Sequence, residues 1–212
     1  MEIVKFTFNP LQENTYLAID KDNNAVVIDP GCYFEEERVF FKNYIEEKDL
    51  KVIALLNTHA HLDHIMGNAF IKEEYGVDLY LHEADLPTLS MGEKSAEMYG
   101  LMDFQPSPQP DVLIKENERL TFEGISFDVI FGPGHAPGHV AFYSPEDKFV
   151  INADILFKGS YGRVDLPGGD FATLKKTITQ KMFQLPDDTL VYTGHGPETT
   201  IGEEKASNPI LW

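Results

Sequence analysis

The run at residues 58–64, Thr-His-Ala-His-Leu-Asp-His, constrains this chain more than any other part of its sequence. It places three imidazoles and one carboxylate close together. These side chains are ligands for zinc and its first-row neighbours. In extended backbone His59 and His61 point to the same side and can reach one cation. Asp63 and His64 follow where the chain turns and can reach a second cation. The run therefore predicts a metal site for one or two ions.

The composition is that of a globular protein with an acidic surface. Of its 212 residues 42% are apolar, which is enough for a substantial core. The formal net charge is −18, and no basic cluster is longer than the pair Lys175 and Lys176. Nucleic acid is therefore not expected as a partner, because phosphate binding needs concentrated Lys and Arg. The apolar runs are too short for a transmembrane helix, so no membrane partner is expected either.

The start of the chain and its cysteine content predict a cytoplasmic location. Residues 1–5 lack the basic and apolar blocks of a signal peptide. Cys32 is the single cysteine, which excludes an internal disulfide and a metal cage made of thiolates alone. We expect Cys32 to be buried in packing. Together these features favour a reducing compartment.

Strands dominate the first part of the chain and then alternate with helices. Apolar spacing predicts helices over 34–48 and 65–75, and this alternation indicates a layered α/β architecture. Residues 92–111 are rich in glycine and proline, so regular structure is not expected across most of them. They fit either a lid over a pocket or an ordinary packed loop. The strands expected in this part are 3–8, 14–19, 25–28, 52–56 and 78–81.

The second half of the chain repeats this pattern. Asp170 is expected to cap a helix, since Phe171, Leu174, Ile178 and Met182 form an apolar stripe after it. Strands followed by a helix and a further strand occur in both halves. We therefore expect two similar halves packed sheet to sheet. The strands expected here are 120–122, 125–131, 140–143, 149–152 and 189–193.

Three further polar residues lie at the ends of predicted strands. His135 and His195 each follow a glycine, and Asp154 follows the strand over 149–152. Binding sites gather at strand ends in open sheets. With the four polar residues of the run, these three make seven candidate ligands, enough for two cations that share one carboxylate. One cation takes His59, His61 and His135, the other takes Asp63, His64 and His195, and Asp154 can bridge both.

This set of residues resembles the metallo-β-lactamase superfamily. Asp29, the histidine-rich run, the Gly-His element at His135, Asp154 and the final Gly-His at His195 occur in the family's order. The resemblance covers nearly the whole chain. It implies an α/β (α+β) fold, the four-layer αββα sandwich, in which two mixed sheets pack face to face with helices outside. It also implies two divalent metal ions, which we take to be zinc, with iron or manganese as alternatives.

Two longer segments are similar to the short glyoxalase II-like (hydroxyacylglutathione hydrolase-like) enzymes. They are residues 154–170 and 192–204, the second beginning Tyr-Thr-Gly-His-Gly-Pro. Glyoxalase II hydrolyses the thioester S-D-lactoylglutathione. The chain is expected to form one domain over 1–212, without the C-terminal helical domain that helps long glyoxalase II enzymes to hold glutathione. Ala153 stands where the family usually has glycine, and Asp154 is a carboxylate that true β-lactamases generally lack.

The resemblance implies hydrolysis of a small-molecule thioester by a metal-bridging hydroxide. Two cations that flank one water lower its pKa toward about 7. Asp63 would orient the metal-bound hydroxide. Asp29 and His139 would contact the ligand histidines without touching the metal ions themselves. By analogy, the residues that meet the substrate would be Lys158, Tyr161 and Arg163.

Some of these residues also have purely structural interpretations. Asp29 could equally cap the loop after its strand. Arg163 could pair with Asp165 or Asp170 and so fix its own loop. His82, which follows a predicted strand, is expected to cap the next helix.

Other activities fit the same motif. A persulfide dioxygenase resembles the chain in its motif run but uses a single iron and oxygen, so metal content and oxygen uptake would separate the two. Lactone or ester hydrolysis shares the hydroxide chemistry, whereas phosphodiester cleavage is disfavoured by the negative charge. A metal-stabilised binding protein without turnover is the last alternative. The seven intact ligands argue against it, because a decayed site usually loses some of them.

Overall fold

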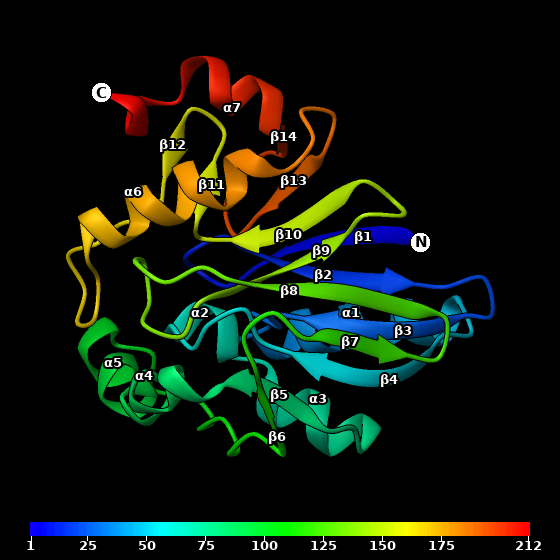
Figure 1. The fold of residues 1–212 in the computed structure, drawn as a ribbon. Helices are drawn as coiled ribbons and strands as arrows, with labels where there is room; N and C mark the ends of the chain where they lie inside the picture. The colour runs from blue at the N-terminus through cyan, green and yellow to red at the C-terminus, as the bar shows by residue number, and fades with distance from the viewer. The chain divides into compact units, whose positions relative to one another are not determined.

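The computed structural model describes residues 1–212 and divides into two compact units (Figure 1). The first unit comprises Met1–Ile114 and Thr121–Ser126, and the second comprises Lys115–Leu120 and Phe127–Trp212. Two six-stranded sheets and one two-stranded hairpin make up the strand content. Both large sheets are mixed, as the family resemblance implied.

The first sheet is mixed because it begins as a meander and continues with strands that alternate with helices. β1, β2 and β3 pair antiparallel, whereas β3 to β6 pair in parallel. Spatial order follows chain order. Its strands are β1 (Glu2–Phe8), β2 (Glu13–Ile19), β3 (Asn24–Ile28), β4 (Lys51–Leu56), β5 (Leu79–His82) and β6 (Val112–Ile114).

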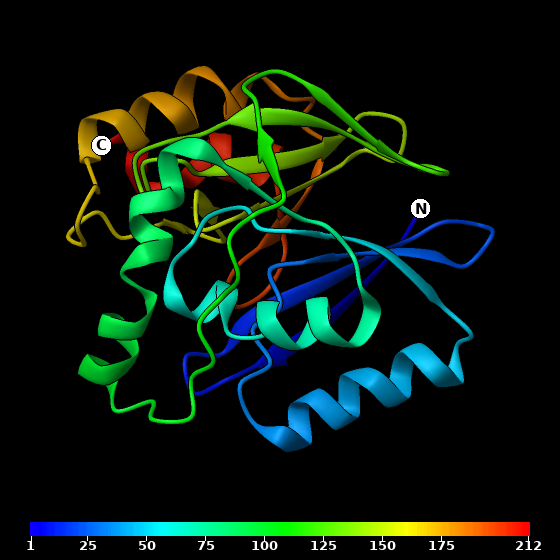
Figure 2. The same ribbon diagram turned by 90° about the horizontal axis from the view of Figure 1, so that it is seen from below.

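Helices α1 (Glu35–Glu47) and α3 (Asn68–Tyr75) pack against this sheet (Figure 2). Phe41 of α1 and Ile71 of α3 are fully buried in one cluster with residues of β1 to β5. The Phe6 ring of β1 meets the Phe41 ring edge to face, with centroids 5.3 Å apart. Apolar spacing of about 3.6 residues puts such side chains on one stripe of each helix, and their burial holds helix to sheet.

The second sheet has the order β14-β13-β10-β9-β8-β7. β10 and β13 pair in parallel, so their connection must cross over, and α6 (Phe171–Gln180) lies within it. Its strands are β7 (Arg119–Phe122), β8 (Ile125–Phe131), β9 (Val140–Ser144), β10 (Phe149–Ala153), β13 (Leu190–Thr193) and β14 (Thr199–Thr200).

Helix α6 and helix α7 (Ile201–Ser207) share a core with this sheet. Leu174 and Ile178 of α6 are fully buried with Val150 and Val191 of the strands. The predicted cap at Asp170 is confirmed, since its Oδ1 accepts a hydrogen bond from Thr173 N at 2.7 Å. None of the helices combines the length and apolar composition needed to span a lipid bilayer.

One helix was predicted over 65–75, but the structure has two helices here, and the first of them includes the end of the histidine-rich run. α2 (Leu62–Ile65) begins before the predicted start. Gly67 separates it from α3, because its N–H donates to Pro30 O at 2.7 Å in another loop. The last two candidate ligands of the run therefore lie on a helical turn.

The prediction of irregular structure for 92–111 is wrong in its first part. Helix α5 (Gly92–Tyr99) follows α4 (Leu86–Ser90), and Gly100 ends it in the left-handed conformation, with φ 70°. The residues between the two glycines favour helix, and Gly100 acts as the stop signal. Leu101 and Phe104 then pack into small apolar clusters of the first unit, as an ordinary packed loop does.

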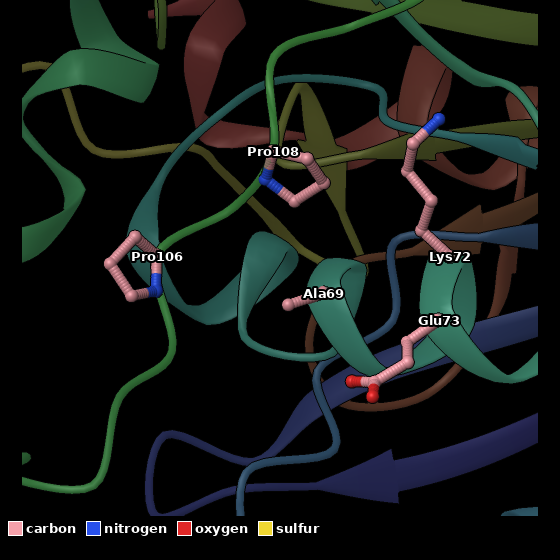
Figure 3. A pocket seen from close by; sticks show the side chains of 5 residues that line it. All are labelled: Ala69, Lys72, Glu73, Pro106 and Pro108. Carbon is pink, nitrogen blue, oxygen red and sulfur yellow. The ribbon is translucent and has the colours of Figure 1, made fainter.

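The rest of this segment runs beside α3. Pro106 and Pro108 line an open pocket of about 340 Å³ together with Ala69, Lys72 and Glu73. Figure 3 shows the Ala69 side chain pointing toward the two prolines. The amine of Lys72 is engaged elsewhere, in an ion pair with Asp111. This hollow carries no set of converging polar groups.

Adjacent phenylalanines on α1 provide a test of this packing. Phe41 is fully buried, whereas Phe40 is 59% exposed. We expect Phe41→Ala to lower the free energy of unfolding by about 3–5 kcal/mol, because a large cavity opens between α1 and β1. Phe40→Ala, the matched control, should cost less than about 1 kcal/mol. Urea unfolding followed by circular dichroism measures both, and equal losses would contradict the packing described.

Candidate functional site

The histidine-rich run follows β4 at the edge where the parallel strands of the first sheet end. β3 and β4 run parallel with Ile28 opposite Leu56, so Asp29 and the run leave the sheet side by side. The main chain joins them, since Asp29 N donates to Leu56 O at 2.9 Å. Strand polarity alone therefore brings an acidic residue beside the imidazoles.

Asp29 is buried beneath the run and accepts several hydrogen bonds from it. Thr58 donates to Asp29 through its N–H at 2.7 Å and through its hydroxyl at 2.6 Å. His64 Nδ1 lies 3.1 Å from Asp29 Oδ2. The predicted contact between Asp29 and a histidine of the run is thus present. The same carboxylate also caps the loop, so the two interpretations are compatible.

This network sets which ring nitrogen carries the proton in the neutral form of two histidines. The Thr58 hydroxyl donates to Asp29, so it accepts from His59 Nδ1 at 3.0 Å. The carboxylate can only accept, so His64 also carries its proton on Nδ1. In both rings Nε2 is then the nitrogen with the lone pair, which is the form that binds a metal.

The donor atoms of the run lie close together within the first unit. The His59 ring centroid is 4.1 Å from that of His64 and 4.8 Å from that of His61. Asp63 Oδ2 lies 3.8 Å from His64 Nε2. His59 and His64 are fully buried, whereas His61 and Asp63 are partly exposed. Three imidazoles and a carboxylate in such proximity are a donor set that suits a divalent cation.

Three supporting residues were not predicted from the sequence. Asp85, fully buried, accepts from Ala60 N at 2.5 Å and so holds the backbone between His59 and His61. Asn57 Nδ2 donates to His64 O at 2.9 Å, and Asn68 Nδ2 donates to Asn57 Oδ1 at 2.7 Å. Asp85 ends the short helix that follows β5, so the strand-end rule that selected Asp154 would have pointed to it. The asparagines carry no comparable signal.

The second unit gathers the other three candidate ligands. Asp154 follows β10 and His195 follows β13, and these neighbouring strands are parallel. Asp154 Oδ2 lies 3.4 Å from His135 Nε2 and 3.6 Å from His195 Nε2. His135 Nδ1 lies 2.8 Å from Arg163 O, which can only accept, so Nε2 is again the nitrogen with the lone pair.

The backbone on either side of Asp154 is tightly constrained. Ala153 has φ 45°, the left-handed region, at a register shift in the pairing of β10 with β13. This explains why glycine is usual there, since a side chain costs about 1 kcal/mol in that conformation. Gly162 passes so close that a Cβ would lie 1.9 Å from Asp154 O. Any larger residue at Gly162 would displace the Asp154 backbone.

The candidate substrate residues lie on and just after the hairpin of β11 (Leu156–Phe157) and β12 (Ser160–Tyr161). Lys158 is in its turn. Arg163 forms a two-point ion pair with Asp165, with both N–O distances 2.8 Å, as one structural interpretation expected. This guanidinium lowers the pKa of Asp165 to about 2.

The remaining histidines have different surroundings. His139 is fully buried, and its ring lies edge-on to the His135 ring with centroids 5.6 Å apart. His82 Nδ1 accepts from Ala84 N at 3.2 Å and caps the short helix Glu83–Asp85, so its predicted capping role is confirmed.

Cys32 is buried in the core of the first unit, as predicted. Burial raises the pKa of its thiol to about 12.

The thiolate of Cys32 is its reactive form, so we expect no reaction of native protein with a disulfide reagent such as DTNB at mildly alkaline pH. Denatured protein should react with one equivalent. Rapid labelling of the native chain would contradict the described packing.

Asp29 should control metal affinity through the two histidines that it orients. Replacing it by asparagine adds a donor where the network needs only acceptors. We expect Asp29→Asn to weaken divalent-metal binding about 10–100-fold, measured by competition with a chromophoric chelator. Asp20→Asn, in the remote turn between β2 and β3, is the control and should bind as the unchanged protein does. Equal affinities in all three proteins would refute this role of Asp29.

Comparison with known proteins extends these observations. The family model described as the metallo-beta-lactamase superfamily matches residues 8–195. The hydroxyacylglutathione hydrolase GloC of Haemophilus influenzae is 38% identical over 212 residues, which are 100% of this chain and 97% of GloC.

Two solved structures show the same fold along almost all of the chain. BLEG-1 B3 metallo-beta-lactamase superposes with a TM-score of 0.90 at 33% identity, covering 99% of each chain. TTHA1623 in a di-iron-bound form has a TM-score of 0.88 at 40% identity, covering 98% of this chain and 100% of the other. The predicted α/β fold with two mixed sheets is therefore confirmed. The chain belongs to the metallo-β-lactamase superfamily and is a metallo-hydrolase.

Proposed function

We propose that this metallo-hydrolase cleaves small-molecule thioesters such as S-D-lactoylglutathione. The observation that carries the substrate class is the 38% identity to a hydroxyacylglutathione hydrolase along the complete length of this chain. The acidity of the chain, with a formal net charge of −18, also favours a small substrate over a nucleic acid. We place the enzyme in the cytoplasm, where the single buried thiol stays reduced.

We propose that seven side chains hold two divalent ions. The fit rests on donor chemistry, because hydrogen bonds hold three imidazoles with Nε2 as the coordinating nitrogen. Zinc is the first choice for a set of imidazoles and carboxylates. Iron is the main alternative, since TTHA1623 is described in a di-iron-bound form. The proposed ligands are His59, His61 and His135 for one ion, Asp63, His64 and His195 for the other, and Asp154 for both.

When bound, the two ions would supply Lewis acidity, which ionises water near neutral pH and stabilises negative charge on an acyl oxygen. The side chains of the protein position the proposed metal ligands and the nucleophile. Asp29 holds His64 directly and His59 through Thr58. Asp63 is partly exposed, so its carboxylate can accept a hydrogen bond from the nucleophile and orient it.

The leaving group in this reaction needs little help from the protein. A thiol with a pKa of about 8.5 departs readily as its thiolate, so no general acid is required. Cys32 takes no part as a covalent nucleophile, because it is buried and stays protonated. Direct attack by water on the thioester carbonyl is therefore the route that the side chains support.

The hairpin after Asp154 is the proposed contact for the thiol part of the substrate. Lys158 is exposed in its turn and can meet a carboxylate. Tyr161 lies partly exposed on β12 and offers a hydroxyl. Arg163 is already paired with Asp165. The pair uses Nε and Nη2, so Arg163 must exchange this partner to bind a substrate carboxylate through the same two nitrogens.

Thiol release from S-D-lactoylglutathione tests the proposal. Zinc-loaded protein should release thiol, and a chelator should abolish the release. Asp154→Asn should lower kcat about 10²–10³-fold, because it weakens the carboxylate shared by both ions. Asp188→Asn, an exposed aspartate paired with Lys148, is the control and should retain full activity.

A small substrate panel separates the competing activities. Nitrocefin is included because BLEG-1 is named a B3 metallo-beta-lactamase, and a lactone is included because it shares the same chemistry. Iron-loaded protein with glutathione persulfide in an oxygen electrode tests dioxygenation. Turnover of one of these without thioester cleavage would reassign the enzyme, and no turnover of any would favour a binding protein.

A further inference from the structure

One buried carboxyl group behind the candidate ligand His64 has no role in the proposed chemistry. Glu13 begins β2 and is fully buried. Its Oε2 accepts from the Thr15 hydroxyl at 2.9 Å. Its Oε1 has no hydrogen-bond partner and lies 3.8 Å from His64 Nδ1. An unpaired buried oxygen of this kind is costly in the charged form, and burial raises the pKa of the Glu13 carboxyl well above its ordinary value. A bound cation nearby would favour the charged form.

Structural support does not account for Glu13. Glu204, another buried carboxylate, accepts from Gly159 N, the Thr199 hydroxyl and Asn208 Nδ2 and so ties three segments together. Glu13 accepts one hydrogen bond, from a residue two positions away on its own strand. It therefore joins no separate elements by hydrogen bonding. Its position points to an electrostatic role.

The surrounding backbone is built to admit this carboxyl group. A Cβ at Gly31 would lie 2.0 Å from Glu13 Oε2 and 2.9 Å from Asp63 O. Gly31 N donates to the Thr15 hydroxyl at 2.8 Å, and Asn9 Nδ2 donates to Gly31 O and Asp63 O at 3.0 and 3.2 Å. The loop after β3, the turn before β2 and the start of α2 thus close around Glu13.

Two carboxyl groups therefore face the same nitrogen of one imidazole. Asp29 accepts the hydrogen bond from His64 Nδ1 and sets the ring orientation. Glu13 lies further off, on the same side of the ring. Negative charge behind an imidazole makes its other nitrogen a stronger donor, and a cation bound there offsets the buried charge. The bound cation and the buried carboxylate would each lower the free-energy cost of the other.

We propose that Glu13 is a positioning residue that strengthens binding of the metal ion held by His64. The inference rests on the proposed assignment of His64 as a ligand, and it is independent of the substrate. Glu13 would act through His64, without touching the ion or the substrate. Its loss should therefore lower metal affinity more than it lowers the stability of the metal-free fold.

Glu13→Gln is the direct test, because the amide keeps the shape and the acceptor for Thr15. Metal-free protein is titrated with zinc against a chromophoric chelator, and bound zinc is counted by elemental analysis. We expect one of the two zinc ions to bind about 10–100-fold more weakly. The melting temperature of the metal-free variant should not fall, because a neutral amide is easier to bury than a carboxylate.

Glu204→Gln is the matched control, a buried carboxylate with three hydrogen bonds in the second unit. It should show the opposite pattern, with unchanged zinc affinity and a lower melting temperature. Glu13→Asp retains the charge and should bind zinc more tightly than Glu13→Gln, which tests charge even if the amide variant folds poorly.

The proposal is overturned if Glu13→Gln binds both zinc ions as tightly as the unchanged protein. It is also overturned if the metal-free variant loses stability while its zinc affinity is retained. Because no substrate enters the measurement, a chain that binds two ions without cleaving thioesters would refute the proposed substrate class and leave the role of Glu13 standing.

Discussion

The orientation of the imidazoles depends on one buried carboxylate, that of Asp29. It accepts a hydrogen bond from His64 Nδ1 directly. Through the Thr58 hydroxyl it also sets the position of the proton on His59. A histidine can coordinate a metal only through its unprotonated nitrogen. One aspartate at a strand end thus orients two imidazole rings so that both leave the same nitrogen, Nε2, without a proton. His135 reaches the same state differently, through the carbonyl of Arg163.

Burial of so much polar surface is tolerable because most of it is hydrogen-bonded. Asp29 and Asp85 each accept backbone N–H groups of the histidine-rich run, and Asn57 and Asn68 continue the network. These contacts fix the path of a loop that would otherwise be mobile, since loops are held only by what they touch. Glu13 Oε1 is one of the buried atoms without a hydrogen bond, and its place behind His64 is the reason to look for a compensating cation.

The regular elements followed closely from sequence pattern, and of the two errors one depends on a long-range contact and the other on how local signals were interpreted. The helix at Glu35–Glu47 and the cap at Asp170 were predictable because both depend on neighbouring residues. The break at Gly67 was not, since its N–H bonds to Pro30, far away in the chain. Helix α5 was missed because the glycines and prolines of 92–111 predicted irregular structure, whereas the two glycines stand at the first position of the helix and just beyond its end.

The sequence by itself determined the family, the metal-binding residue types and their order along the chain, because those depend on local composition and on which strand each residue follows. Tertiary structure alone decided which nitrogen each imidazole presents, that Asp85 and Glu13 stand behind the run, and that Arg163 is occupied by Asp165. Those choices depend on hydrogen-bond partners brought together by strand pairing and burial. The partners of Asp29, Asp85 and Glu13 are distant in sequence, so no pattern of neighbouring residues specifies these contacts. Arg163 and Asp165 stand only two residues apart, and there the structure selected one of two local partners.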